Sequence, residues 1–214
     1  NLKKKENFKN VLFLIISKSG NTLETLTNFR KLNIINNNSK NIIIITEKKN
    51  NFLYSLSKRF NLFYIEHKDY IGGRYSVFSE VGIVPAYLMG ININKFRSNL
   101  RVYLEGKLAL ILKESVIKLA SILKENKINN LIFINYLPEI KKTLLWNQQL
   151  IAESLGKKSK GILPVISNMP KDNHSLMQLY LEGFKNSFYT FFFVNESLSP
   201  KINNKILLKT HSYL

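Results

Sequence analysis

Short, uninterrupted apolar runs, each followed by a polar turn, constrain the fold of this chain more than any other feature. The first two runs are Val11–Ile16 and Ile42–Ile45. Such runs are typical of strands that are buried on both faces of a parallel sheet. Helical patterns follow at 22–31 and 51–59, and an alternating strand pattern follows at 62–66. This order of elements predicts an α/β fold with helices on both faces of a parallel sheet.

The second half of the chain repeats this alternation and predicts a second α/β unit. Leu131–Ile134 is another buried strand pattern, and the helix expected at 143–155 ends at Gly156, a common C-terminal signal. We therefore expect two domains, 1–97 and 98–214, both incomplete. The other expected elements are a connection at 90–99, a long amphipathic helix at 101–126, a short helix at 175–181 and a strand at 188–194.

Composition excludes several classes of protein. The 214 residues carry a formal charge of +18 but include no cysteine, so disulfides and cysteine-ligated metals are excluded. Of the 32 basic residues 27 are lysine, and with 27 asparagines and 25 isoleucines they point to A/T-rich codons rather than to selection for a polyanion. No apolar run has the length of a membrane span. We expect a cytoplasmic protein with no nucleic-acid or membrane partner.

The turn after the first strand is the first candidate for chemistry. Ser17, Lys18, Ser19 and Thr22 bring hydroxyls and a cation to the start of a helix, and Gly20 allows close approach of a ligand. Ligands of open α/β sheets bind at the carboxyl ends of the strands. Two interpretations stay open at this point, a phosphate site and an ordinary helix N-cap. The spacing of a Walker A loop is absent.

Three further segments carry groups suited to proton transfer or anion stabilisation. Paired glycines precede Arg74 and allow positive φ or close contact with a ligand, and an arginine there can stabilise an oxyanion. Glu153 has apolar neighbours in the sequence that favour a role as a base, and Gln149 lies on the same helix face. His174 precedes an apolar helix, and a histidine there could serve as an acid or a base. Each of these residues has an ordinary structural alternative. His67 and His211 have no supporting context, and no histidine pair has zinc spacing.

Taken together, these segments resemble the phosphoglucose isomerase family, in its bacterial form. The resemblance rests on four motifs in the family's order, which cover most of the chain from Val11 to Val194. They are Ser17–Thr25, the first family signature at Gly72–Pro85, the segment Gln148–Lys157 around Glu153, and the stretches Lys160–Val165 and Pro170–Gly183. The family has two sugar-isomerase (SIS) domains, each a parallel sheet between helices, which agrees with the two α/β units expected above.

The resemblance implies isomerisation of glucose 6-phosphate to fructose 6-phosphate, in glycolysis and gluconeogenesis, without a metal or an organic cofactor. It implies that Ser17, Ser19 and Thr22 hold the phosphate with the Lys18 backbone. Glu153 would move the proton between C2 and C1, and His174 would assist ring opening. Arg74 would stabilise the enediolate, Gly73 would line the site and Gln149 would contact the substrate. The family forms homodimers, and His174 is the candidate for a residue lent by the partner chain.

The sequence also departs from the family pattern. The segments that normally precede the phosphate loop, and the C-terminal signature with its lysine, are missing, and 194–214 match no family segment. We therefore expect an internal fragment that is inactive or nearly so by itself. Three alternatives stay open: a bifunctional glucose/mannose-6-phosphate isomerase, a non-catalytic SIS module that binds a sugar phosphate, and a basic nucleic-acid binder. The last needs clustered arginines or exposed aromatics on a basic face.

Overall fold

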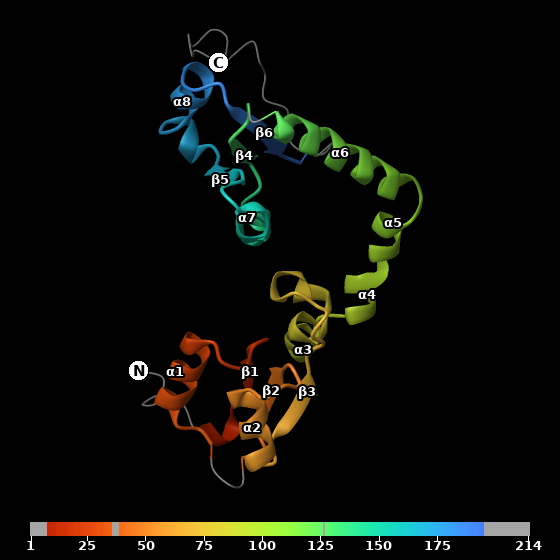
Figure 1. The fold of residues 1–214 in the computed structure, drawn as a ribbon, viewed down its shortest axis with the longest axis vertical. Helices are drawn as coiled ribbons and strands as arrows, with labels where there is room; N and C mark the ends of the chain where they lie inside the picture. Colours follow the sequence, from red (N-terminus) through yellow and green to blue (C-terminus); the bar gives the residue numbers. More distant parts are fainter. Residues whose placement is uncertain (1–7, 36–38, 126, 195–214) are drawn as a thin grey trace, which may run out of the picture. The chain divides into compact units, whose positions relative to one another are not determined.

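The computed structural model describes residues 8–35, 39–125 and 127–194. The chain divides into two compact units, Asn1–Lys113 and Glu114–Leu214, each with one three-stranded parallel sheet and flanking helices (Figure 1). The expected fold class, α/β with parallel SIS-type sheets between helices, is confirmed. The division falls inside a helix near residue 113, whereas the boundary expected at 97/98 stays a prediction.

The sheet of the first unit has the order β1-β2-β3, with strands Phe13–Ile16, Ile42–Thr46 and Phe63–Glu66. Ile15 lies opposite Ile44, and Ile44 lies opposite Tyr64. The central strand β2 is the most apolar because helices α1 (Leu23–Leu32) and α2 (Phe52–Arg59) bury it. The buried core of this unit consists of Ile15, Ile42, Ile44, Leu53 and Leu62.

Asparagines occupy several helix boundaries in this unit. Helix α1 ends at Asn33, whose φ of 47° is left-handed and whose backbone N–H bonds back to the carbonyls of Phe29 and Arg30. Asn61, after α2, has the same φ of 47°. Asn51 begins α2, and its side chain accepts a hydrogen bond from the Tyr54 N–H at 2.9 Å. A short polar amide side chain tolerates left-handed backbone and caps helices for the same reason, which is local hydrogen bonding.

The chain between the two sheets is more helical than the sequence predicts. After a 3₁₀ turn, η3 (Gly73–Phe78), comes α3 (Glu80–Leu88). The connection expected at 90–99 contains helix α4 (Ile93–Ser98), capped by Asn92. The single helix expected at 101–126 is two helices, α5 (Leu100–Leu104) and α6 (Gly106–Lys124), because Glu105 is extended and Gly106 has a φ of +81°.

The sheet of the second unit has the order β5-β4-β6, with β4 (Asn130–Asn135) in the centre. Its edge strands are β5 (Leu163–Asn168) and β6 (Ser187–Phe192), and the helices are α7 (Lys141–Leu155) and α8 (Met177–Glu182). The sequence did not predict β5, because Pro164 and the polar residues at its end weaken the strand pattern. A proline is tolerated there because β5 lies at an edge. A core cluster lies on each face of β4. One contains the buried side chains Leu131, Phe133 and Leu144, and the other contains Ile132, Ile134 and Met169.

Candidate functional site

The loop between β1 and α1 gathers three hydroxyls at one point. Ser17 is buried, and its Oγ lies 2.7 Å from Thr22 Oγ1, while Ser19 Oγ lies 3.5 Å from the same atom. Thr22 occupies the N-cap position of α1, yet its side chain caps no N–H of the described first turn. Of the two open interpretations, the helix N-cap therefore loses its main support. These hydroxyls lie at the start of α1, and the dipole of a helix favours an anion at its start.

Gly20 fixes this loop against the next one. Its φ is +66°, and a Cβ built there would lie 1.9 Å from Asn51 Oδ1, so no side chain fits. The Leu53 N–H donates to the Gly20 carbonyl at 3.3 Å, and the Phe52 N–H donates to Asn21 Oδ1 at 3.0 Å. The loops after β1 and β2 are therefore interlocked at the carboxyl edge of the sheet, where parallel sheets bind their ligands.

The Lys18 side chain is engaged with protein groups. Its Nζ lies 3.2 Å from Glu47 Oε1 and donates to the backbone carbonyls of Asp69, at 2.9 Å, and of Ile71. Glu47 is buried and also pairs with Lys49 at 2.9 Å. The Lys49 ammonium, with help from Lys18, lowers the pKa of Glu47 despite its burial. The sequence predicts that Lys18 brings a positive charge to the loop, but in the structure Glu47 balances that charge.

The segment Gly72–Arg74 leaves β3 on the same edge of the sheet. Gly72 has an ordinary φ of −63°, and neither glycine of the pair has a positive φ, so of the two uses expected for them only close contact with a ligand remains open. No atom lies within 4 Å of a Cβ built on Gly73, which leaves this glycine open to a ligand. Arg74 is half-buried at the start of η3. The first unit thus brings together Ser17, Lys18, Ser19 and Thr22 and ties them, through Lys18, to the segment that holds Gly73 and Arg74.

Sequence reasoning dismissed His67, which the structure places at the same edge. The residue follows β3 directly, and only 1% of its surface is exposed. Its Nδ1 contacts Glu80 Oε1, and its Nε2 lies 3.2 Å from the Ile71 carbonyl oxygen. A usable signal existed, since a histidine directly after a strand lies at the edge where ligands bind.

In the second unit, Gln149 and Glu153 lie on one face of α7, as predicted. The Gln149 amide donates to Glu153 Oε1 at 2.9 Å, and both residues are exposed. The apolar surroundings expected for Glu153 are therefore not found among the described residues. His174 is also exposed and follows a 3₁₀ turn, η5 (Lys171–Asn173), after β5. This turn is held by Asp172, whose Oδ2 accepts a hydrogen bond from the Asn168 N–H at 2.8 Å.

Glu153 and His174 lie at opposite edges of this sheet. Helix α7 connects two parallel strands and so runs antiparallel to them. The Gln148 amide donates to the Pro164 carbonyl at 2.8 Å, which places that helical turn beside the beginning of β5. Glu153 lies further along α7, beyond that end of the strand, whereas His174 follows the other end. A six-residue strand separates the two ends by about 20 Å.

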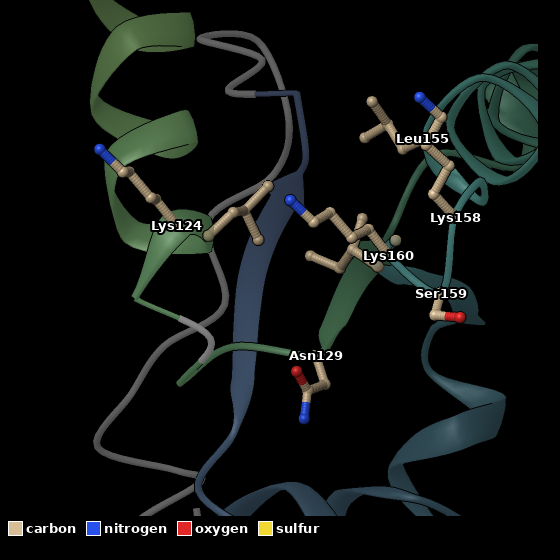
Figure 2. A pocket seen from close by; sticks show the side chains of 9 residues that line it. Lys124, Asn129, Leu155, Lys158, Ser159 and Lys160 are labelled. Atoms are coloured by element: carbon tan, nitrogen blue, oxygen red, sulfur yellow. The ribbon is translucent and has the colours of Figure 1, made fainter.

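The second unit also has an open cavity of about 770 Å³ at the amino edge of its sheet (Figure 2). Lys124, Lys158 and Lys160 lie around it with Asn129, Leu155 and Ser159. None of the predicted site residues lines this cavity, and its lysines are exposed to solvent. Within the described residues there is no group of three or more possible metal-ligating side chains, and no helix is long and apolar enough to cross a bilayer.

Comparisons with known proteins give a consistent set of relatives. No family model matches the chain. The glucose-6-phosphate isomerase of Methanocaldococcus jannaschii is 33% identical over 201 residues, covering 88% of this chain and 48% of that protein. The enzyme of the same name from Mycoplasmopsis pulmonis is 33% identical, covering 86% of this chain and 45% of the relative. The enzyme of the same name from Campylobacter jejuni is 30% identical, covering 92% of this chain and 51% of that protein.

A solved structure supports the fold. It is the crystal structure of a hypothetical protein from Thermus thermophilus, with a TM-score of 0.76 and 24% identity, covering 98% of this chain and 54% of that one. The chain spans about half the length of the curated relatives it matches. The resemblance that the motifs predict is thereby confirmed: over most of its length, this chain is related in sequence to the glucose-6-phosphate isomerases.

Proposed function

We propose that this chain is part of a cytoplasmic glucose-6-phosphate isomerase, which interconverts glucose 6-phosphate and fructose 6-phosphate in glycolysis and gluconeogenesis. The observation that carries the proposal is the Ser17–Ser19–Thr22 hydroxyl cluster at the start of α1, in a chain whose relatives bear that enzyme's name. A cluster of hydroxyls and free helix N–H groups fits a phosphate dianion, and a sugar phosphate brings one.

The phosphate would bind to the Ser17, Ser19 and Thr22 hydroxyls and to the first N–H groups of α1. Lys18 would contribute through its backbone, because its ammonium is engaged with Glu47 and with two carbonyls. This binding fixes one end of the substrate and leaves its reacting carbons to groups outside the loop. Binding energy at a remote phosphate then serves to orient the reacting end of the sugar.

At the reacting end, Glu153 would remove the proton from C2. The electron pair of that C–H bond forms the C1=C2 double bond, and the carbonyl pair moves onto O1 as an enediolate. Arg74 would stabilise this anion, and Gly73 would let the substrate approach the backbone. Glu153 then returns the proton to C1 while the hydroxyl proton passes from O2 to O1, which leaves a carbonyl at C2. Gln149 would hold the Glu153 carboxylate, and His174 would open the sugar ring.

The opposite-edge positions of Glu153 and His174 support a homodimer. Both groups serve one substrate in the proposed mechanism, yet a strand of about 20 Å separates their edges within one unit. A second copy of the chain would supply His174 to a site that already holds Glu153. A single copy would then be inactive or nearly so.

A coupled assay for glucose 6-phosphate formation from fructose 6-phosphate tests the proposal. The 214-residue chain is compared with the same chain joined to the flanking segments of the Methanocaldococcus jannaschii relative, each with and without Glu153→Gln. We expect turnover in the joined protein, a loss of at least a thousandfold in Glu153→Gln, and little turnover in the short chain. Turnover that survives Glu153→Gln would remove that residue from the mechanism.

The exposure of Glu153 favours one other function, a non-catalytic module that binds a sugar phosphate. Such a module needs the hydroxyl cluster but no base. The same proteins distinguish the two functions when fructose 6-phosphate binding is measured by calorimetry. Binding without turnover in the joined protein would favour the module, whereas binding with turnover favours the isomerase.

A further inference from the structure

A second network of polar groups, with a buried His67 and a half-buried Lys18 side chain, lies beside the hydroxyl cluster and has no place in the mechanism above. Its centre is the carbonyl oxygen of Ile71, which directly precedes Gly72, Gly73 and Arg74. This oxygen accepts hydrogen bonds from Lys18 Nζ, in the phosphate loop, and from His67 Nε2, at the end of β3. One backbone atom therefore joins the phosphate loop to the segment that holds Arg74.

The hydrogen-bond partners of His67 fix its ring. A carbonyl oxygen can only accept, so Nε2 must carry a proton. Nδ1 contacts Glu80 Oε1 on the other side of the ring. The imidazole is therefore held on both sides, and it is completely buried. The backbone N–H of His67 also donates to the Thr46 carbonyl at 2.9 Å, which anchors the residue to β2.

The two anchors of this network lie on opposite sides of Arg74 in the sequence. His67 precedes the segment and Glu80 begins α3 after it, so their contact closes the stretch 67–80 into a loop. Lys18 adds a second tether through the carbonyls of Asp69 and Ile71, and its charge is balanced by Glu47. Buried ionic groups cost free energy unless they are paired, and those described here are paired.

We propose that His67, Glu80 and the Lys18 side chain are positioning residues that hold Arg74 at a fixed place relative to the phosphate loop. The inference rests on the proposed function, because it assigns to Arg74 the stabilisation of the enediolate. None of the three side chains needs to contact the sugar. A phosphate held in the loop and an arginine held beside the reacting carbons then keep a constant separation, which is what an isomerase needs between the two ends of its substrate.

The first test uses the 214-residue chain and does not depend on activity. His67→Leu keeps the volume of the side chain and removes both hydrogen bonds, whereas His67→Gln retains a donor and an acceptor. Amide hydrogen exchange of the peptide that covers 68–79 is measured by mass spectrometry. We expect at least tenfold faster exchange in His67→Leu and less than threefold in His67→Gln and Glu80→Gln. Lys68→Ala is the control, because Lys68 is 49% exposed and pairs only with Glu66 among the described residues.

The second test uses the joined protein in the isomerase assay. We expect His67→Leu to lower kcat at least tenfold while KM changes less than threefold, because the phosphate contacts persist and only the arginine loses its place. His67→Gln should restore most of kcat. Unchanged exchange in His67→Leu would overturn the proposal, and so would faster exchange with unchanged kcat, which would leave the pair a purely structural role. An inactive parent protein would instead overturn the proposed function, and the exchange result would still decide whether the tether exists.

Discussion

The two units have the same kind of sheet but distribute their candidate residues differently. In the first unit, the loops after all three strands meet at the carboxyl edge. The Asn21 side chain joins the first loop to the second, and the Lys18 side chain joins the first loop to the third. In the second unit, Glu153 and His174 lie at opposite edges, and both are exposed. The proposed phosphate site thus lies within one small parallel sheet, because its parts are backbone groups and short hydroxyls. The roles proposed for Glu153 and His174 need surfaces from elsewhere.

The largest expected effect tests whether the units are independent in stability. Leu144 is 1% exposed in the core of the second unit, and its neighbour Leu145 is 42% exposed. Leu144→Ala should lower the free energy of unfolding of that unit by about 2–5 kcal/mol, whereas Leu145→Ala should cost less than about 1 kcal/mol. Urea unfolding followed through Trp146 reports on this unit, and exchange of peptides from β2 reports on the other. An equal loss of protection in β2 would show that the two units unfold together.

The next effect concerns the interlocked loops of the first unit. Gly20→Ala combines a φ of +66° with a contact of 1.9 Å to Asn51 Oδ1, so it should cost about 2–4 kcal/mol. Gly90→Ala is the matched control, because its φ is +80° but no atom lies within 4 Å of the added Cβ. Gly90→Ala should lower the free energy of unfolding by about 1–2 kcal/mol, from backbone strain alone. Thermal unfolding of both variants measures the difference in stability. Equal losses would show that the contact with Asn51 adds nothing to the backbone strain at Gly20.

A smaller effect appears at alkaline pH and again belongs to the first unit alone. Burial, with a contribution from Glu66, raises the pKa of Tyr64 to about 12, and its hydroxyl donates to the Thr46 carbonyl at 3.1 Å. In the unfolded chain this group ionises near pH 10. The folded state therefore binds the proton more tightly, and stability falls as the pH rises between these two values. The loss should be on the order of 1–2 kcal/mol.

The comparison of wild type with Tyr64→Phe isolates this effect from the titrating lysines. Urea unfolding at a series of alkaline pH values should give a steeper loss of stability in the wild type than in the variant. Parallel curves would mean that the phenol ionises equally easily in the folded and unfolded states.

The smallest effect appears in acid. Lys49 and Lys18 lower the pKa of Glu47 below its usual 4.5, so the carboxylate contributes stability above that pH and loses it as the pH falls through the folded value. Lys49→Met removes the largest cause and should make the first unit less sensitive to acid. Unfolding by urea at mildly acidic pH, compared with Lys48→Met, checks this. An unchanged acid response in Lys49→Met would show that Lys49 is not the cause of the lowered pKa of Glu47.

The strands were predictable where their residues are apolar throughout. The run Ile42–Ile45 predicted β2 because a strand buried on both faces leaves no room for polar residues. The run Val11–Ile16 also predicted β1, although only Ile15 of this edge strand is buried. The edge strand β5 was missed because an edge tolerates Pro164. Helix α4 was missed because Asn92 and Asn94 read as loop residues, although Asn92 is the N-cap. The apolar periodicity of 101–126 continues across Gly106, so it predicted one helix where the structure has α5 and α6.

The candidate site was predictable in its motifs and less so in its geometry. The Ser17–Thr22 loop follows from the strand–turn–helix pattern, and the shared face of Gln149 and Glu153 follows from helical spacing. The tether by Lys18 was not predictable, since its carbonyl partners lie more than fifty positions away in the sequence. The place of His67 at this edge could have been inferred from its position directly after a strand, but its pairing with Glu80 could not, because only the turn between β3 and α3 brings the two together.

The left-handed asparagines at the end of α1 and after α2 have a consequence for how such a chain evolves. Codons for glycine begin with two guanines, whereas those for asparagine begin with two adenines. A genome that drifts toward A and T therefore encodes less glycine, the residue that most often ends a helix, and more asparagine, which can also take the left-handed conformation there. Asn33 and Asn61 hold left-handed positions of the kind that glycine most often occupies at the end of a helix. Gly20 has no such substitute, because Asn51 already fills the space that any side chain there would occupy. Mutational drift can therefore rewrite the helix ends of this fold while leaving its ligand loop unchanged.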